Sequence, residues 1–351
     1  MTVTSPRSRR WRRALLITLA SLLALLLVAI AAFQLSPWPS VLLLRAVGDD
    51  GSETAAQSEA LVSEGVQEHL DIPYSADDPD LTMDVFRPEG DQGPLPAVVW
   101  VHGGGFIGGS KEMLRPYLAI LASHGFVTVN VEYQHAPEEQ YPAPVEQLSA
   151  ALEHVTAEAE QLGTDPAQIV LGGDSAGAHI AGQTALAISD AEYASRAGLP
   201  QALPAASLRA ALLFSGPSDL SLAETDDRLA SWYIRTVIWA YTGQKDVADS
   251  PELSPLSLVD HVSAAYPPSF ISTGPSDPLL SHSESMSAHL EAAGAETTTL
   301  FFDPETTPES VGHEYALALD TPQAAQAMVE TVAFLHAHTD GPQLPGASAQ
   351  W

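Results

Sequence analysis

Residues 169–181 read IVLGGDSAGAHIA, and this stretch decides the fold. An apolar run from Ile169 to Leu171 precedes the glycine-rich segment 172–177 and a series of helix-forming residues, which predicts a strand, a tight turn and a helix. Ser175 has a glycine two positions away on each side, the spacing of a nucleophile elbow. At such a turn the serine hydroxyl stands clear of the backbone, and the N–H of Ala176 lies at a positively polarised helix N-terminus. Ordinary turns also produce this short match, so the partners of Ser175 have to be found elsewhere in the chain.

Short β-rich runs alternate with helical stretches along most of the chain. Continuous apolar runs separated by helices are typical of parallel strands that are buried on both faces. We therefore predict a three-layer α/β/α sandwich with a mostly parallel central sheet. We expect an outer strand at 82–86, further strands at 97–101, 127–131, 169–171, 209–214, 269–273 and 297–302, and helices at 111–124 and 143–162.

The apolar strand at 97–101 runs directly into HGGGF at 102–106. Three consecutive glycines are conformationally costly, so a structure keeps them where the backbone takes unusual angles or approaches another group closely. After a central strand, such a loop can direct backbone N–H groups into a cleft, although a flexible turn is the alternative reading. His102 is expected to hydrogen-bond this loop rather than to act as a base. The predicted oxyanion hole consists of the N–H groups of Gly103, Gly104 and Ala176.

Several motifs fall in the order of a known family. HGGGF at 102–106 and GDSAG at 173–177, with Tyr133, APE at 136–138 and YPAP at 141–144 between them, resemble the hormone-sensitive-lipase-like branch of the α/β-hydrolase esterases. The resemblance covers roughly residues 70–338. It implies the α/β-hydrolase fold and a carboxylesterase, with an acid after the next-to-last strand and a histidine after the last.

Both expected partners of Ser175 are present. Asp277 follows the strand that ends at Thr273, and His313 lies in the loop after the last strand. His313 is the candidate general base, and Asp277 would orient its ring and stabilise the imidazolium. The order of serine, aspartate and histidine is that of α/β-hydrolases. The predicted reaction is hydrolysis of a carboxylic ester through an acyl-enzyme on Ser175.

Other residues compete for these roles. Asp219 also follows a strand, one position earlier than the chain-order template requires. Asp174 is expected to point away from its neighbour Ser175 and to serve the turn. His282 and His289 lie in a helical stretch, where packing or surface roles are expected. The sequence departs from the family pattern at Ala178, where a further glycine is frequent, and at Glu314-Tyr315, where Gly-Phe is common.

An insertion at about 217–266 carries several aromatic residues at helical spacing. Apolar positions between Trp232 and Tyr241 predict an amphipathic helix. The resemblance implies that cap helices cover the cleft at this point, and ordinary packing of the helix on the sheet is the alternative. We expect the substrate pocket to include Phe106, Trp232 and Trp239.

The N-terminus predicts export from the cytoplasm. Residues 1–13 contain five arginines, and residues 14–33 form an uncharged run that is long enough to span a bilayer. The positive flank predicts a cytoplasmic N-terminus, a single-pass anchor in the cell membrane and a catalytic domain outside. Secretion after signal-peptide cleavage is the alternative, because Ala29-Ile30-Ala31 has the character of a cleavage site. We expect a linker at 34–65 with a short helix that reaches about Glu68, a catalytic domain at 66–340 and a tail at 341–351.

Composition narrows the range of partners. The chain has 44 acidic residues against 14 basic ones, a net charge of −30, so it would repel nucleic acid and none is expected as a partner. It has no cysteine, which excludes thiolate catalysis and zinc–thiolate sites. The predicted chemistry needs a small-molecule ester and neither a cofactor nor a metal. A serine peptidase or amidase on the same fold, and a non-catalytic small-molecule-binding module, remain as alternatives.

Overall fold

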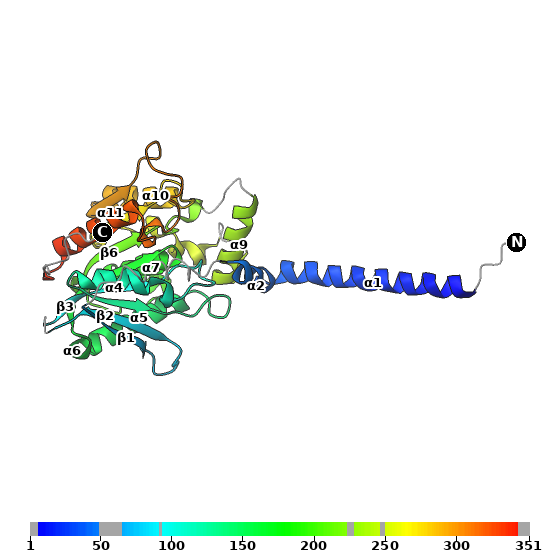
Figure 1. Cartoon of the computed structure of the whole chain (residues 1–351), viewed down its shortest axis with the longest axis horizontal. Helices are drawn as coiled ribbons and strands as arrows, with labels where there is room; N and C mark the ends of the chain where they lie inside the picture. The colour runs from blue at the N-terminus through cyan, green and yellow to red at the C-terminus, as the bar shows by residue number, and fades with distance from the viewer. Residues whose placement is uncertain (1–5, 49–64, 91–92, 223–227, 246–249, 343–351) are drawn as a thin grey trace. The chain divides into compact units, whose positions relative to one another are not determined.

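The computed structural model describes residues 6–48, 65–90, 93–222, 228–245 and 250–342. The chain divides into two compact units, residues 1–48 and 49–351. In the first unit, α1 spans Pro6–Leu35 and α2 spans Trp38–Val47. The 22 residues Ala14–Leu35 are long and apolar enough to cross a membrane or to act as a signal sequence, and α1 is continuous through them (Figure 1). The predicted helix at 14–33 is therefore confirmed, whereas α2 occupies part of the predicted linker.

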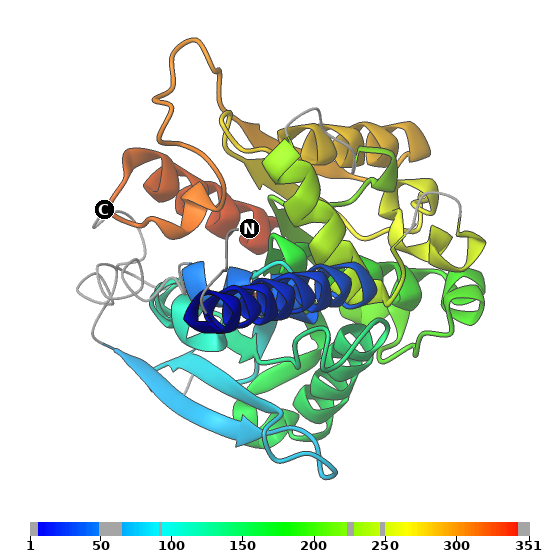
Figure 2. The same ribbon diagram turned by 90° about the vertical axis from the view of Figure 1, so that its right-hand side faces the viewer.

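The second unit is built on an eight-stranded sheet of order β1-β2-β4-β3-β5-β6-β7-β8. β2 pairs antiparallel with β1 and with β4, and all other neighbours are parallel. Figures 1 and 2 show helices against both faces of this sheet, so the predicted three-layer α/β/α sandwich is confirmed. The strands are β1 Val66–Pro73, β2 Thr82–Pro88, β3 Leu95–Val101, β4 Val127–Val131, β5 Thr164–Asp174, β6 Leu208–Phe214, β7 Ser269–Thr273 and β8 Thr297–Phe301.

The edge strand β1 is the main difference from the predicted sheet. It begins at Val66, inside the segment where the sequence predicted a linker and a short helix, so the strand at 82–86 is not the outermost one. Residues 67–71 of β1 are all exposed, and they read QEHLD. A strand at the edge of a sheet can be polar on both faces, so no alternation of apolar residues marks it. Residues 49–64, which hold most of the expected linker and short helix, lie outside the described residues.

Two helical layers enclose the sheet. Helices α4 (Arg115–Ser123) and α11 (Pro322–His338) share a buried core with Val98, Trp100 and Leu212 on one face. Helices α7 (Ala176–Ser189) and α10 (Leu280–Ala293) pack on the other, together with α5 (Ala143–Ala157). The remaining helices are η1 Lys111–Leu114, α6 Ala159–Leu162, α8 Ala191–Ala197, η2 Ala205–Ser207, η3 Leu220–Leu222, α9 Arg228–Thr242, η4 Pro251–Leu256, η5 Leu258–Asp260 and η6 Tyr315–Leu317.

An ion-pair network fixes η1 and α4 to the antiparallel strands. Lys111 Nζ lies 2.6 Å from Asp84 Oδ1 and 2.5 Å from Asp71 Oδ1. Arg115 Nε donates to Asp84 Oδ2 at 2.7 Å. The Asp84 carboxylate is fully buried and the Lys111 side chain is 3% exposed, so each charge depends on its partners. The network thus holds η1 and α4 in place directly after residues 102–109, which we call the glycine loop.

Candidate active site

Ser175 stands on the turn between β5 and α7. Its φ of 51° and ψ of −120° form a backbone conformation that a residue other than glycine rarely adopts. The Ser175 N–H donates to the carbonyl oxygen of Phe214 on β6 at 2.8 Å, which ties the turn to the neighbouring strand. Strained backbone of this kind is found at functional sites that the surrounding structure enforces. The predicted strand, turn and helix are thus confirmed at this position.

The structure brings Ser175, Asp277 and His313 together. His313 Nε2 lies 2.9 Å from Ser175 Oγ, and His313 Nδ1 lies 3.0 Å from both carboxylate oxygens of Asp277. Asp277 also accepts hydrogen bonds from Thr273 Oγ1 at 2.8 Å and from the Leu279 N–H at 2.7 Å. With Nδ1–H donating to the carboxylate, Nε2 is free to accept the serine proton.

Asp277 and His313 each stabilise the charged form of the other. Burial by itself would raise the pKa of Asp277, but the hydrogen bond and charge of His313 lower it below its ordinary value. Burial would lower the pKa of His313, but the hydrogen bond to Asp277 raises it above its ordinary value, and negative charge on the neighbouring carboxyl groups acts in the same direction. Asp277 is therefore a carboxylate near neutral pH, and it favours the imidazolium form of His313.

The competing residues have other partners. Asp219 accepts hydrogen bonds from Ser221 and Ser285, and its own N–H lies 3.3 Å from His282 Nδ1. His289 Nδ1 lies 2.8 Å from the carbonyl oxygen of Ser285, one helical turn earlier. These contacts agree with the packing and surface roles that the sequence suggested for both histidines.

The glycine loop differs from its prediction at Gly103. The Gly103 N–H donates to Asp174 Oδ2 at 2.8 Å, so the prediction that this group serves an oxyanion hole is wrong. Within the described part of the chain, no hydrogen bond occupies the N–H of Gly104 or of Gly105. The N–H of Ala176 belongs to the first turn of α7, where no acceptor exists within the helix. The available donors are therefore those of Gly104, Gly105 and Ala176.

Asp174 connects the turn of Ser175 to the glycine loop through hydrogen bonds. Its buried carboxylate accepts a hydrogen bond from Trp100 Nε1 at 2.8 Å in addition to the one from Gly103. It also shares a hydrogen bond with the carboxyl group of Glu314. The expectation that Asp174 points away from the serine hydroxyl agrees with these contacts, but its role extends beyond the turn to the glycine loop.

Glu314 is a site residue for which the sequence predicted no role. This residue has a left-handed φ of 54°, and Glu314 Oε1 lies 3.6 Å from His313 Nε2. Burial, followed by the charge of Asp174, raises the pKa of Glu314 to about 8. One feature of the sequence could have drawn attention to Glu314, namely that Glu314-Tyr315 stands where Gly-Phe is common. Its meaning depends on the neighbours of Glu314, which only the structure shows.

His102 supports the glycine loop, as the sequence predicted. Its Nδ1 lies 2.7 Å from the carbonyl oxygen of Gly103 and its Nε2 lies 2.8 Å from Glu132 Oε1. Because both acceptors need an N–H, the ring is an imidazolium; burial opposes this form, but Glu132 raises the pKa of His102. Together with His135, the ligand atoms of this group lie within 4.8 Å of one another and could hold a metal ion. The ion pair between His102 and Glu132 accounts for their arrangement by itself.

Helix α9 of the predicted cap approaches the glycine loop with Tyr233 and Val237. An added Cβ on Gly105 would lie 2.6 Å from Tyr233 Oη and 3.7 Å from Val237 Cγ2. At 100° per residue, Trp232 and Trp239 fall on the opposite side of the helix from Val237, and Lys245 Nζ lies 4.2 Å from the centre of the Trp239 ring. Their substrate-binding role stays a prediction that these contacts do not support.

Phe106, the third predicted pocket residue, packs beneath the cap. Its ring stacks on Tyr241 of α9 with centroids 4.0 Å apart and meets the edge of His179 at 5.6 Å. Phe106 is 6% exposed. In this structure it anchors the cap to the glycine loop, and contact with substrate stays a prediction.

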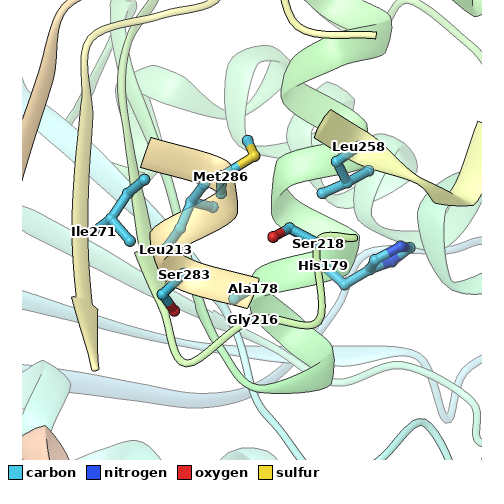
Figure 3. A pocket seen from close by; sticks show the side chains of 9 residues that line it. All are labelled: Ala178, His179, Leu213, Gly216, Ser218, Leu258, Ile271, Ser283 and Met286. Atoms are coloured by element: carbon cyan, nitrogen blue, oxygen red, sulfur yellow. The ribbon is translucent and has the colours of Figure 1, made fainter. Parts of the chain in front are cut away.

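A separate small cavity lies between α7, α10 and the strands β6 and β7 (Figure 3). Leu213 and Ile271 of the sheet and Met286 of α10 line it, together with His179 and Ser283. Ser175 and His313 are not among its lining residues. Burial lowers the pKa of His179 to about 4, so this histidine is neutral beside the cavity.

Comparison with known proteins places the chain in a family. The family model described as "alpha/beta hydrolase fold" matches residues 98–306. The chain is 28% identical to Esterase LipQ of Mycobacterium tuberculosis over 65% of this chain and 54% of LipQ. It is 29% identical to Carboxylesterase NlhH of the same species over 71% of this chain and 75% of NlhH.

A solved structure, that of esterase B from Lactobacillus rhamnosis, shares the fold. It aligns with a TM-score of 0.71 at 22% identity over 86% of this chain and 96% of that protein. The match to LipQ spans only about half of that relative's length. Because the family model covers more than half of the chain and the observed sheet has the corresponding architecture, the protein belongs to the alpha/beta hydrolase fold family.

Proposed function

We propose that the chain is a carboxylesterase that hydrolyses carboxylic esters through an acyl-enzyme on Ser175. The observation that carries this proposal is the position of His313, whose Nε2 lies 2.9 Å from Ser175 Oγ while Nδ1 contacts Asp277. A serine hydroxyl becomes a useful nucleophile only when a base removes its proton, and this geometry supplies the base. The esterases among the relatives support the choice of an ester as substrate.

Acylation begins with proton transfer from Ser175 Oγ to His313 Nε2 as Oγ attacks the ester carbonyl carbon. The resulting imidazolium donates from Nδ1 to the Asp277 carboxylate, which stabilises its charge. When the tetrahedral intermediate collapses, the bond to the alcohol oxygen breaks and Nε2 returns the proton to the leaving alcohol. The acyl group stays on Ser175.

The negative oxygen of the tetrahedral intermediate would be stabilised by backbone N–H groups. Gly104, Gly105 and Ala176 supply these donors, because the N–H of Gly103 is already bound to Asp174. A donor of this kind typically lowers the barrier by about 3 kcal/mol. Since the donors belong to the backbone, the hole is preorganised and requires no side-chain movement.

Deacylation repeats the sequence with water as the nucleophile. His313 Nε2 takes a proton from water, the hydroxide attacks the acyl carbon, and the second tetrahedral intermediate expels Ser175 Oγ, which recovers its proton from Nε2. No step draws on a group outside these side chains, the backbone donors, the ester and water.

The domain organisation is part of the same proposal. Residues 66–340 would form the catalytic domain, with the insertion at 217–266 as its cap. The helix at 14–35 would anchor the protein in the cell membrane with this domain outside, because arginines precede it and it is long enough to span. Cleavage at the Ala29-Ile30-Ala31 segment, giving a secreted enzyme, is the alternative.

The test is hydrolysis of short-chain and long-chain nitrophenyl esters by the wild-type protein and by Ser175→Ala. Ser189→Ala, at the C-terminal end of the same helix, is the matched control because its hydroxyl bonds only within α7. We expect Ser175→Ala to lose turnover, to keep its circular dichroism spectrum and to resist labelling by a fluorophosphonate, while Ser189→Ala reacts normally. A folded wild-type protein without esterase activity would contradict the proposal, and nitroanilide amides would then test the amidase alternative.

A further inference from the structure

Three segments of the chain meet around the α-carbon of Gly103. An added Cβ on this glycine would lie 2.5 Å from Asp174 Oδ2, 2.6 Å from Glu314 Oε1 and 3.1 Å from Ser175 Cβ. Asp174 ends the strand before the serine, and Glu314 directly follows His313. The two carboxyl groups therefore converge at the point where the glycine loop passes the site.

Two carboxyl groups in contact share a hydrogen bond only if one of them is protonated. Asp174 already accepts N–H groups from Trp100 and Gly103, both of which favour its ionised form. Glu314 is partly buried and accepts no comparable pair of N–H donors among the described residues, and it lies beside Asp174 itself. The shared proton therefore belongs on Glu314, which agrees with the upward direction of its pKa.

The remaining charged and titratable neighbours are consistent with this assignment. His313 is the nearest group that favours an ionised Glu314, and Asp277 opposes it. Two tyrosines, from the loop after β4 and from α9, face the group as neutral phenols. The imidazolium of His102 interacts with Asp174 and favours its ionised form. Among the described residues, the groups that face Glu314 are Asp174, His313, Asp277, Tyr133 and Tyr233, with His102 acting through Asp174.

We propose that Glu314 is a positioning residue: as a neutral acid it donates a hydrogen bond to Asp174 and thereby ties the loop of His313 to the glycine loop that carries the oxyanion donors. The inference rests on the proposed esterase function. Gly103 is bound to the same carboxylate, so Asp174 is the common acceptor for both loops. The Asp174 carboxylate then fixes the position of the general base, His313, relative to the oxyanion donors of the glycine loop.

Loss of the shared proton would break this connection. Two adjacent carboxylates repel each other, which pushes the loop of His313 away from the glycine loop. The added charge would also lie close to the developing oxyanion and oppose its formation. Turnover by this protein should therefore fall at alkaline pH, where a site with only a histidine base would reach a plateau.

The experiment compares kcat and kcat/KM for a soluble nitrophenyl ester in the wild-type protein, Glu314→Gln and Glu314→Ala, from about pH 6 to about pH 10. Glutamine retains a donor for Asp174 but cannot ionise, whereas alanine has no donor. Glu305→Gln, an exposed carboxylate between β8 and α11, is the matched control. Each protein is first titrated with a fluorophosphonate, so that rates refer to reactive sites.

We expect kcat of the wild-type protein to decline above about pH 8 and the decline to be absent in Glu314→Gln. At neutral pH, Glu314→Ala should lose about tenfold or more in kcat through misplacement of the base, and Glu314→Gln should recover most of that loss. Glu305→Gln should follow the wild-type profile.

Two results would overturn the inference. One is an alkaline decline that persists unchanged in Glu314→Gln, and the other is a Glu314→Ala protein with the kcat and pH profile of wild type. Both require a wild-type protein whose turnover depends on Ser175. Absence of turnover in the wild-type protein would instead contradict the proposed function, so the two failures are distinguishable.

Discussion

His313 lies between the Ser175 hydroxyl and the Asp277 carboxylate, and Asp277 determines much of its protonation. A base must be neutral to accept a proton, so activity is lost as pH falls through the pKa of His313. Because this pKa is raised, the acidic limb of kcat/KM should lie at higher pH than that of an ordinary histidine.

Substitution of Asp277 by asparagine should change both the rate and the position of this limb. A neutral amide could no longer stabilise the imidazolium, so kcat should fall by about 10³-fold to 10⁴-fold. Loss of the negative charge should also move the acidic limb of kcat/KM to lower pH. The measurement is the pH profile of nitrophenyl ester hydrolysis by Asp277→Asn, and an unmoved limb with near wild-type kcat would contradict the assigned partner of His313.

At the scale of single residues, the sequence predicted which residues come together, because this depends on their order along the chain. It did not predict the directions of individual backbone N–H groups and side chains. Ser175, Asp277 and His313 each follow a strand, and parallel strands bring their C-terminal ends to one edge of a sheet. The direction of the Gly103 N–H depends on backbone angles that a run of three glycines does not specify. The contact between Glu314 and Asp174 joins residues 140 positions apart, and no local pattern encodes it.

The glycine loop is an element whose shape tolerates few side chains. Gly104 has a φ of +116°, and an added Cβ would collide with the backbone of Gly108. By contrast, the nearest atom to an added Cβ on Gly108 is 3.9 Å away, an ordinary contact. The two glycines therefore provide a matched pair within one loop.

Gly104→Ala should lose most activity and become less stable, whereas Gly108→Ala should resemble wild type. Strained backbone of this kind costs about 1–3 kcal/mol, and displacement of the Gly104 N–H removes an oxyanion donor. Thermal unfolding and kcat/KM of the two variants check this. Equal activity in both would show that the conformation of Gly104 is unimportant for the reaction.

The buried ion-pair network is a second element-scale test. Lys111→Met should lower the free energy of unfolding by about 3 kcal/mol, because the buried Asp84 carboxylate would keep Arg115 as its charged partner and only the N–H of Asp71 at Oδ1. Glu112→Gln, which affects only an exposed carboxylate, should cost less than about 1 kcal/mol. Urea unfolding of both variants gives the comparison, and similar midpoints would mean that Lys111 contributes no more than a surface pair.

The strands that consist of buried apolar runs were predictable from the sequence. The exposed edge strand β1 and helix α2 were not. The central strands β3 and β4 are buried throughout and read as continuous apolar segments. Strand β1 exposes most of its side chains, so hydrogen bonding to β2 rather than burial defines it. Helix α2 lies within residues 34–65, which the sequence predicts as a linker.

At the scale of the whole molecule, the two units have opposite charge. All six charged residues before Asp49 are arginines, which leaves eight basic residues against 44 acidic ones in the second unit. The first unit should therefore determine association with a membrane, and the second should determine catalysis. The two properties are separable by truncation.

A chain that begins at Asp49 should remain soluble and hydrolyse a water-soluble nitrophenyl ester with the kcat/KM of the full chain. The full chain should sediment with phosphatidylcholine vesicles, and the truncated chain should not. Mass spectrometry of the full-length protein from its membrane fraction distinguishes an intact anchor from cleavage after the Ala29-Ile30-Ala31 segment. A full chain that stays in the supernatant with an intact N-terminus would contradict the anchor.

The crowding around Gly103 has consequences for protein engineering. The glycine loop, the residue before Ser175 and the residue after His313 share one small volume, so a chimera that imports one of them would disturb the other two. Directed evolution of substrate preference should accordingly accumulate its changes on α9, where Tyr233 and Val237 can vary, before it alters this junction.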